Sequence, residues 1–293
     1  MSAVAATGSS LLNALCDDAA IFPPGSLPLA EAVPAHLEHR ASSHRRMVGP
    51  FVISSAQLAE LGLLVEDQPA TSFEVSVTVP SPSGVAAALE QAEAIAALRV
   101  TGIEVMVPEG FPVETVVPSL DTALTYRPEI AVFVELPRNE LRAALVMALG
   151  STSYLAKLRT GGVRADLYPN EQELAEAIVA SVAAKVPFKA TAGLHHAVRN
   201  TDPQTGFEQH GFLNLVTAVD AALAGADEAR VERLLAERDP DRVAAQARAA
   251  GARALPVRGQ FRSFGTCSIT EPLEELVALS LLSRTGDRGG DLR

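Results

Sequence analysis

Two strand-like segments of this chain each carry a lysine that is followed closely by a glycine turn. The segment YLAKLRTGG contains Lys157, and the segment PFKATAGLHH contains Lys189. Lysine fits poorly inside a packed sheet unless it is paired or takes part in chemistry. If both side chains enter one cavity, each positive charge lowers the pKa of the other lysine, which leaves a neutral amine able to attack a carbonyl carbon. The pair therefore predicts a nucleophilic amine site.

Both lysine segments belong to a longer alternation of strands and helices, repeated at intervals of roughly 30 residues. The strands are apolar runs that read as buried on both faces, which is typical of a parallel sheet with crossover helices. Eight strands are predicted, around Asp18, Val52, Val75, Val105, Val134, Ala156, Lys189 and Phe264. In a chain of 293 residues, this pattern predicts a (β/α)8 TIM barrel formed by residues 1–293 as a single domain.

Other features of the chain refine this prediction. The rival architecture is an open doubly wound sheet, and we disfavour it because no GxGxxG or P-loop pattern follows the first strand. Residues 211–226 and 228–252 have helical patterns, with a break at Asp239-Pro240. They predict an extended helical excursion between the last two strands. We expect residues 1–10 and 284–293 to be loose ends.

Composition excludes several classes of protein. The net charge is −11, aromatic residues make up 4% and tryptophan is absent, which argues against a general nucleic-acid or membrane-surface protein. Without an apolar run long enough to span a bilayer, we expect a cytoplasmic protein. Cys16 and Cys267 have no metal-ligand spacing. The sequence leaves the oligomeric state open, a homo-oligomer included.

In a TIM barrel the carboxyl ends of the strands and the loops after them form the active face. The polar residues expected there are Asp17, Asp18, Glu104, Glu135, Lys157, Arg159, Lys189, His195, His196, Thr266 and Ser268. Glycine turns at the same ends contain Thr160, Gly161, Gly162, Gly193 and Gly265. Such turns can present backbone N–H groups to an anion. The guanidinium of Arg159 suits a carboxylate or a phosphate.

These motifs resemble those of the deoxyribose-phosphate aldolase type of class I aldolase. YLAKLRTGG resembles the IKTSTG motif of strand six in that family, which gives Lys157 the role of the Schiff-base lysine. PFKATAGLHH resembles the strand-seven motif FKPAGG or VKASGG, whose lysine lowers the pKa of the first. GIEVMVP resembles the EVDVV-like motif of strand four, which makes Glu104 the proton-transfer residue.

Two further motifs extend the resemblance across most of the chain. DAAIFPP is similar to the DHTLLKP start of the family, which places Asp18 in the pocket. SFGTCS resembles the last-strand GTSS or GASS turn, so Gly265, Thr266 and Ser268 would help to hold phosphate. The resemblance implies a lyase without metal or organic cofactor, acting on a small anionic carbonyl compound such as a sugar phosphate or a keto acid.

The chain also departs from the family pattern. Glu104 replaces an aspartate, Arg159 stands where the family has a small residue, and His195 follows a single Gly193 where the family has a glycine pair. Three alternatives stay open at this point. The first is a purely structural ion-pair network of the lysines and glutamates. The second is a non-covalent isomerase or a metal-assisted lyase that uses His195, His196, His210 and Glu135. The third is a barrel that binds a metabolite without turnover.

Overall fold

Eight parallel strands form a closed barrel in the computed structural model, which describes residues 11–283. Around the barrel the strands follow the order β1-β10-β7-β6-β5-β4-β3-β2. Their bounds are β1 Cys16–Asp18, β2 Val48–Ser54, β3 Phe73–Val79, β4 Leu98–Val105, β5 Ala131–Glu135, β6 Leu155–Arg159, β7 Phe188–Thr191 and β10 Phe261–Thr266. The predicted TIM barrel is confirmed, and the two expected loose ends lie outside the described residues.

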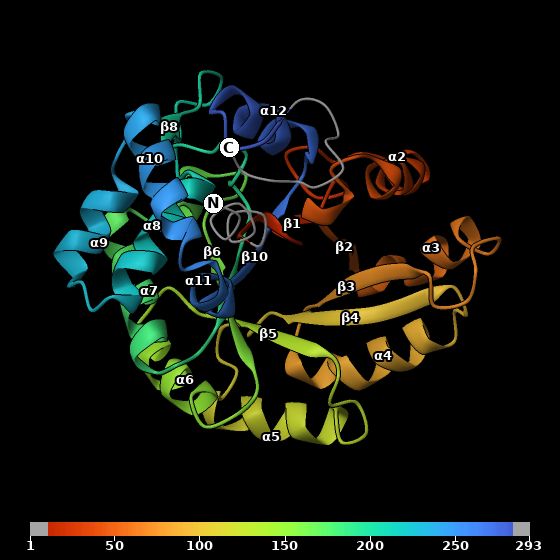
Figure 1. Ribbon diagram of the computed structural model, residues 1–293. Coiled ribbons are helices and arrows are strands. Elements are labelled where there is room, and N and C mark those ends of the chain that lie inside the picture. Colours follow the sequence, from red (N-terminus) through yellow and green to blue (C-terminus); the bar gives the residue numbers. More distant parts are fainter. Residues whose placement is uncertain (1–10, 284–293) are drawn as a thin grey trace.

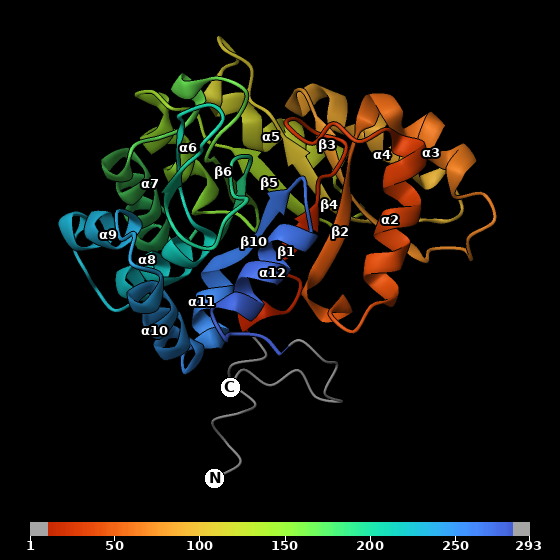
Figure 2. The ribbon, with the colours of Figure 1, turned by 90° about the horizontal axis from the view of Figure 1, so that it is seen from above.

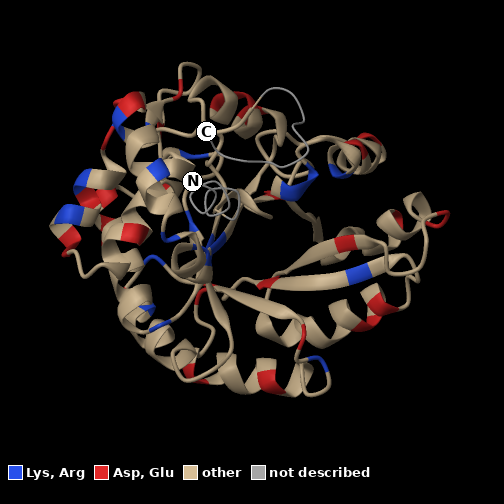
Figure 3. Ribbon diagram, in the orientation of Figure 1, with Lys and Arg blue, Asp and Glu red and all other residues tan. Residues whose placement is uncertain are grey.

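Helices surround the barrel as an outer ring, which is visible in Figure 1. The helices that follow strands are α2 Leu29–Ala41, α3 Leu58–Leu64, α4 Val85–Glu93, α5 Val113–Ala123, α6 Leu141–Leu149, α7 Glu171–Ala183 and α12 Thr270–Ala278. Most charged positions lie on these outer elements, and a smaller group lies on the inner strands (Figure 3). Among residues 11–283, no helix combines the length and the apolar character needed to cross a membrane.

The segment between β7 and β10 contains the predicted helical excursion. It begins with a small hairpin, β8 Asn200–Thr201 and β9 Glu208–Gln209, and continues with α8 Phe212–Leu223, α9 Glu228–Leu235, α10 Pro240–Gly251 and α11 Ala254–Gln260. The break falls where it was expected, because the Asp239 side chain caps α10 and Pro240 is its first residue. Such a proline lacks only an N–H that a helix start leaves unpaired.

Helix α8 connects this excursion to the barrel. It is buried on most of its surface, and its Phe212 stacks on Phe264 of β10 with ring centroids 4.9 Å apart. Figure 2 shows α8 to α10 on the side of the molecule opposite α2 to α4. The excursion therefore covers the part of the barrel wall that holds the second lysine strand.

Candidate active site

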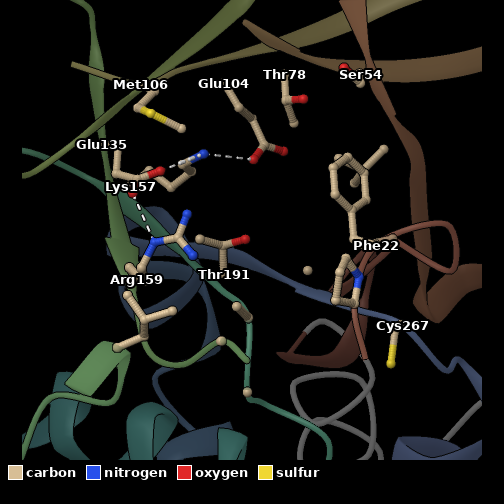
Figure 4. A pocket seen from close by; sticks show the side chains of 18 of the residues that line it. Phe22, Ser54, Thr78, Glu104, Met106, Glu135, Lys157, Arg159, Thr191 and Cys267 are labelled. Atoms are coloured by element: carbon tan, nitrogen blue, oxygen red, sulfur yellow. Dashed lines mark hydrogen bonds and ion pairs between the residues drawn. The ribbon is translucent and has the colours of Figure 1, made fainter. Parts of the chain in front are cut away.

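A cavity of about 440 Å³ opens at the carboxyl ends of the strands. Four charged side chains lie on the part of its wall formed by β4, β5 and β6: Glu104, Glu135, Lys157 and Arg159. Apolar side chains line much of the rest, among them Phe22, Val79, Pro80 and Met106. Figure 4 shows the charged group facing Phe22 across the cavity. The cavity thus has a charged side and an apolar side.

Lys157 reaches the cavity from β6. Its backbone lies in register with Glu135 of β5 and Lys189 of β7, so the side chains of these three adjacent strands project from the same face of the sheet, into the barrel. The Lys157 Nζ atom lies 3.0 Å from Glu135 Oε2 and 3.5 Å from Glu104 Oε2. The residue is 6% exposed, yet it lines the cavity. A small molecule bound there would meet its amine directly.

Lys189 lies deeper in the barrel, and the residues that line the cavity do not include it. Its Nζ atom donates hydrogen bonds to Asp17 Oδ2 and Glu104 Oε1, both at 2.5 Å. It also lies 5.3 Å from the centre of the Phe133 ring. Burial alone would lower the pKa of Lys189, but the carboxylates of Asp17 and Glu104 raise it above its ordinary value. The expectation of mutually lowered lysine pKa values is therefore wrong for Lys189, since the carboxylates outweigh the second lysine.

Glu104 lies between the two lysines. Its Oε1 atom accepts hydrogen bonds from Lys189 and from the Ser76 hydroxyl, the latter at 2.9 Å. Burial would raise the pKa of Glu104, but the charges of Lys189 and Lys157 lower it to about 2. A carboxylate with so low a pKa stays ionised at neutral pH and is a weak base. Its main physical effect on the cavity is a fixed negative charge.

Glu135 has a different environment on the neighbouring strand. Its Oε1 atom accepts a hydrogen bond from Arg159 Nε at 3.0 Å. Its buried Oε2 atom is the one beside Lys157, and it makes no hydrogen bond with good geometry. Burial would raise the pKa of Glu135, but Lys157 and Arg159 lower it below the ordinary value. Because its Oε2 atom lies 3.0 Å from Lys157 Nζ, against 3.5 Å for Glu104 Oε2, Glu135 is better placed than Glu104 to exchange a proton with Lys157.

The two aspartates of β1 point in opposite directions. Asp17 enters the barrel, where its Oδ2 atom accepts hydrogen bonds from Lys189 and from Ser263. Asp18 points away and binds His36 of α2, with Oδ2 and Nδ1 2.9 Å apart. The prediction that Asp18 lies in the pocket is corrected, because side chains alternate along a strand and Asp17 occupies the inward position.

The glycine turns are used partly for packing within the protein. Gly162, Gly193 and Gly265 line the cavity. The Thr160 hydroxyl is buried and donates to the carbonyls of Thr191 and Ala192. In the last turn, the Thr266 hydroxyl donates to the Ser268 carbonyl, and the Ser268 hydroxyl accepts from the Glu271 N–H at the start of α12. Thr160, Gly161, Thr266 and Ser268 are not among the residues that line the cavity.

The turn at Gly193 tests this packing directly. Gly193 has φ +71°, and a Cβ atom there would lie 2.8 Å from the Tyr168 ring and 2.9 Å from Gly161 Cα. Gly193→Ala is expected to lower the free energy of unfolding by about 2–4 kcal/mol, because it adds overlap to an unfavourable φ. Gly206, with φ +72° and open space around it, is the matched control and should cost only about 1 kcal/mol. Urea denaturation of both variants measures the difference, and equal losses would contradict the prediction.

The histidines of the metal hypothesis lie in separate environments. His195 lines the cavity, with Nδ1 3.5 Å from both Cys267 Sγ and Glu271 Oε2. Its Nε2 atom is buried without a hydrogen-bond partner among the described residues, and burial lowers its pKa. His196 pairs with Glu275, which raises the pKa of His196. Residues 11–283 contain no group of three or more His, Cys, Asp or Glu side chains placed to hold a metal ion.

His210 is buried and is not among the residues that line the cavity, and its burial predicts a pH effect on stability. Its Nε2 atom pairs with the Pro169 carbonyl, and Arg199, Glu171 and Glu208 surround it. Burial lowers the pKa of His210 to about 4. Between the unfolded pKa of about 6.5 and this value, the unfolded state binds more protons, so stability falls as the pH falls.

Protonation of this single histidine is expected to lower the free energy of unfolding by about 3 kcal/mol between roughly pH 7 and pH 4. Comparison of wild type and His210→Asn by urea denaturation across this range isolates its share from that of other groups. The variant should lose less stability on acidification. The same slope in both proteins would show that His210 is not buried as a neutral ring.

Several residues of the site carry no obvious signal in the sequence. Ser76 donates a hydrogen bond to Glu104, and Ser263 donates one to Asp17. Each is a single small polar residue in an otherwise apolar strand. The apolar lining residues, such as Phe22 and Met106, lie in segments that look like ordinary loop and core sequence. Polar residues at inward positions of otherwise apolar strands are the one usable signal, and it requires the phase of each strand.

The fold and the position of the cavity define the class of structure: a TIM-barrel protein with ionisable side chains at the carboxyl ends of its strands. Among solved structures, the chain is similar to deoxyribose phosphate aldolase from Aeropyrum pernix, whose structure is tetrameric. The TM-score is 0.51 over 95% of this chain and 100% of the aldolase, at 14% sequence identity. No family model and no curated protein matches the sequence. At this identity the likeness establishes the fold alone.

Proposed function

We propose that the protein is a class I aldolase, a carbon–carbon lyase that forms a Schiff base between Lys157 and a small carbonyl compound. The observation that carries this proposal is the buried Lys157 amine, which lines a cavity beside two carboxylates and above a second lysine. The fold shared with an aldolase supports the same reading. The finer expectation from the sequence, an anionic substrate, would rest on Arg159 at the edge of this cavity.

The reaction begins with the transfer of a proton from Lys157 to Glu135, across the 3.0 Å that separates them. The neutral amine attacks the substrate carbonyl carbon, and one proton passes from the nitrogen to the carbonyl oxygen to give a neutral carbinolamine. Glu135 then returns its proton to the new hydroxyl group, which leaves as water while the nitrogen lone pair forms the protonated Schiff base. Glu104, ionised and 3.5 Å from the nitrogen, stabilises this positive charge.

In the cleavage direction, a hydroxyl group on the carbon β to the Schiff base then loses its proton to a base. The bond between the α and β carbons breaks, its electron pair moves toward the nitrogen, and an aldehyde leaves. The resulting enamine takes up a proton on carbon. Water hydrolyses the Schiff base and restores the Lys157 amine. In this scheme Lys189 holds Glu104 and Asp17 in place.

Borohydride trapping tests this function. The chain contains only three lysines, Lys157, Lys185 and Lys189, so peptide mapping of a reduced adduct is unambiguous. We expect an adduct on Lys157 with at least one member of a panel of aldehydes, keto acids and sugar phosphates. An adduct on Lys189 would reverse the roles of the two lysines. Folded protein that yields no adduct with any carbonyl would overturn the proposal.

A further inference from the structure

We infer that the substrate of this site is an α-keto acid, or an aldol formed from one, whose carboxylate binds Arg159 and whose remainder is uncharged and apolar. The inference rests on the proposed Schiff-base function and names the chemical class on which it acts. The sequence left either a phosphate or a carboxylate as the anionic group of the substrate, and the inference assigns a carboxylate and excludes a phosphate. Three features of the cavity support the carboxylate, and the opposite wall supports the apolar remainder.

The first feature is the free end of Arg159. Its Nε atom donates to Glu135 Oε1, whereas its two terminal NH₂ groups donate no hydrogen bond to any residue between 11 and 283. The side chain is 29% exposed, and Figure 4 places the guanidinium next to Lys157 and Thr191 at the edge of the cavity. A guanidinium presents its donors as a planar fork that matches the two oxygens of a carboxylate.

The second feature is the spacing between Arg159 and Lys157. They are two positions apart on β6, so both side chains lie on the same face of the strand. Each pairs at 3.0 Å with a different oxygen of the same Glu135 carboxylate. The amine and the guanidinium therefore flank one carboxylate group. In an α-keto acid the carbonyl and the carboxylate lie on adjacent carbon atoms, so we expect the carbonyl to reach the Lys157 amine while the carboxylate binds the Arg159 guanidinium. When Glu135 takes the proton of Lys157, it also loses the charge that holds Arg159.

The third feature is the charge of the cavity wall. The charged lining residues are two carboxylates and two cations, Glu104, Glu135, Lys157 and Arg159. Lys157 must be neutral to react, so the wall then offers one cation beside acidic groups. The hydroxyls of Thr160 and Thr266 donate to backbone carbonyls, and Glu271 adds negative charge near His195. The side chains therefore offer a phosphate dianion a single cation beside carboxylates, whereas the one negative charge of a carboxylate matches that cation.

The cavity wall across from the charged group determines the chemistry of the rest of the substrate. Phe22, Val52, Val79 and Pro80 line this wall, and Met106, which is 44% exposed, adds an apolar surface beside the charged group (Figure 4). Methionine and aromatic side chains stabilise apolar ligand groups through contact area and the release of water. A branched or aromatic substituent on the keto acid, or on the aldehyde that joins it, would fill this side. A second charged group there would be desolvated without a side chain of opposite charge.

Binding of an unreactive probe tests the carboxylate site without any Schiff-base chemistry. Hydrocinnamate has an apolar ring and a carboxylate but no ketone, and its affinity can be measured by calorimetry beside that of inorganic phosphate. We expect hydrocinnamate to bind more tightly than phosphate, and Arg159→Gln to weaken it about 10- to 100-fold, as for a lost charge-assisted hydrogen bond. Arg253→Gln, which removes an arginine from an exposed ion pair with Asp220, should leave the affinity unchanged.

The reactive arm uses borohydride trapping of phenylpyruvate, pyruvate and glyceraldehyde phosphate. We expect phenylpyruvate to give the highest yield of adduct on Lys157, and Arg159→Gln to reduce that yield. Adducts with glyceraldehyde phosphate but with neither keto acid would overturn the substrate class and leave the Schiff-base function standing. Hydrocinnamate bound through Arg159 without any trapped adduct would overturn the Schiff-base function and, with it, the keto-acid assignment. Phosphate that binds more tightly than hydrocinnamate would overturn the inference on its own.

Discussion

Replacing Lys189 by methionine is expected to lower the free energy of unfolding by about 3–5 kcal/mol. The side chain is 1% exposed and is the shared cation of Asp17 and Glu104. Methionine fills a similar volume but leaves two carboxylates buried beside each other without their cation. Chemical denaturation at neutral pH, followed by circular dichroism, measures the loss.

Two further variants show whether charge causes this loss. Lys185→Met removes an exposed lysine and should change stability by less than about 0.5 kcal/mol. Adding Asp17→Asn to Lys189→Met removes one of the two buried carboxylate charges that lost their shared cation, so the double variant should regain part of the stability. A double variant less stable than Lys189→Met would contradict this account, and would place the main contribution of Lys189 in packing against Phe133.

Lys157→Met is expected to have the opposite profile, with turnover lost and the fold retained. Without the amine no Schiff base forms, and we expect aldol cleavage to slow by at least about 10³-fold. Glu135 keeps Arg159 as its partner and Glu104 keeps Lys189, so the free energy of unfolding should change by less than about 2 kcal/mol. Steady-state rates with the substrate identified by trapping, and denaturation of the same preparation, give both numbers.

Under the proposed function, Lys157 has the reactive role and Lys189 the supporting role. Glu135→Gln should slow Schiff-base formation by about 10²- to 10⁴-fold if this carboxylate carries the proton of Lys157. Its effect should appear in the rate of adduct formation and in the pH profile of that rate. Full activity of Lys157→Met would overturn the assignment, and would favour a purely structural ion-pair network.

The fold could be predicted because its signals are local. Apolar runs alternate with amphipathic helices, and the eight predicted strand positions all lie in or beside barrel strands, from Asp18 in β1 to Phe264 in β10. The helix break at Asp239-Pro240 followed from a cap and a proline at adjacent positions. These features depend on a few neighbouring residues, so no long-range information was needed.

The site could be predicted only in part, because its electrostatics depend on distant residues. The sequence identified Lys157, Lys189 and Glu104 as one group, but Lys189 also pairs with Asp17, 172 positions away. β1 has only three residues, and its pairing with β2 changes register, so the phase that separates Asp17 from Asp18 cannot be counted from a neighbour. The direction of the Lys189 pKa shift depends on the same contact.

Barrel closure through β1 and β10 has a consequence for synthesis on the ribosome. Asp17 binds Ser263, 246 positions later in the chain, so the strand made first is completed by one of the last. At roughly 5–20 residues per second, β1 waits on the order of 10–50 s for β10 to be translated. During that interval the seam between β1 and β10 stays open, and its strand edges are accessible to molecular chaperones and to other nascent chains.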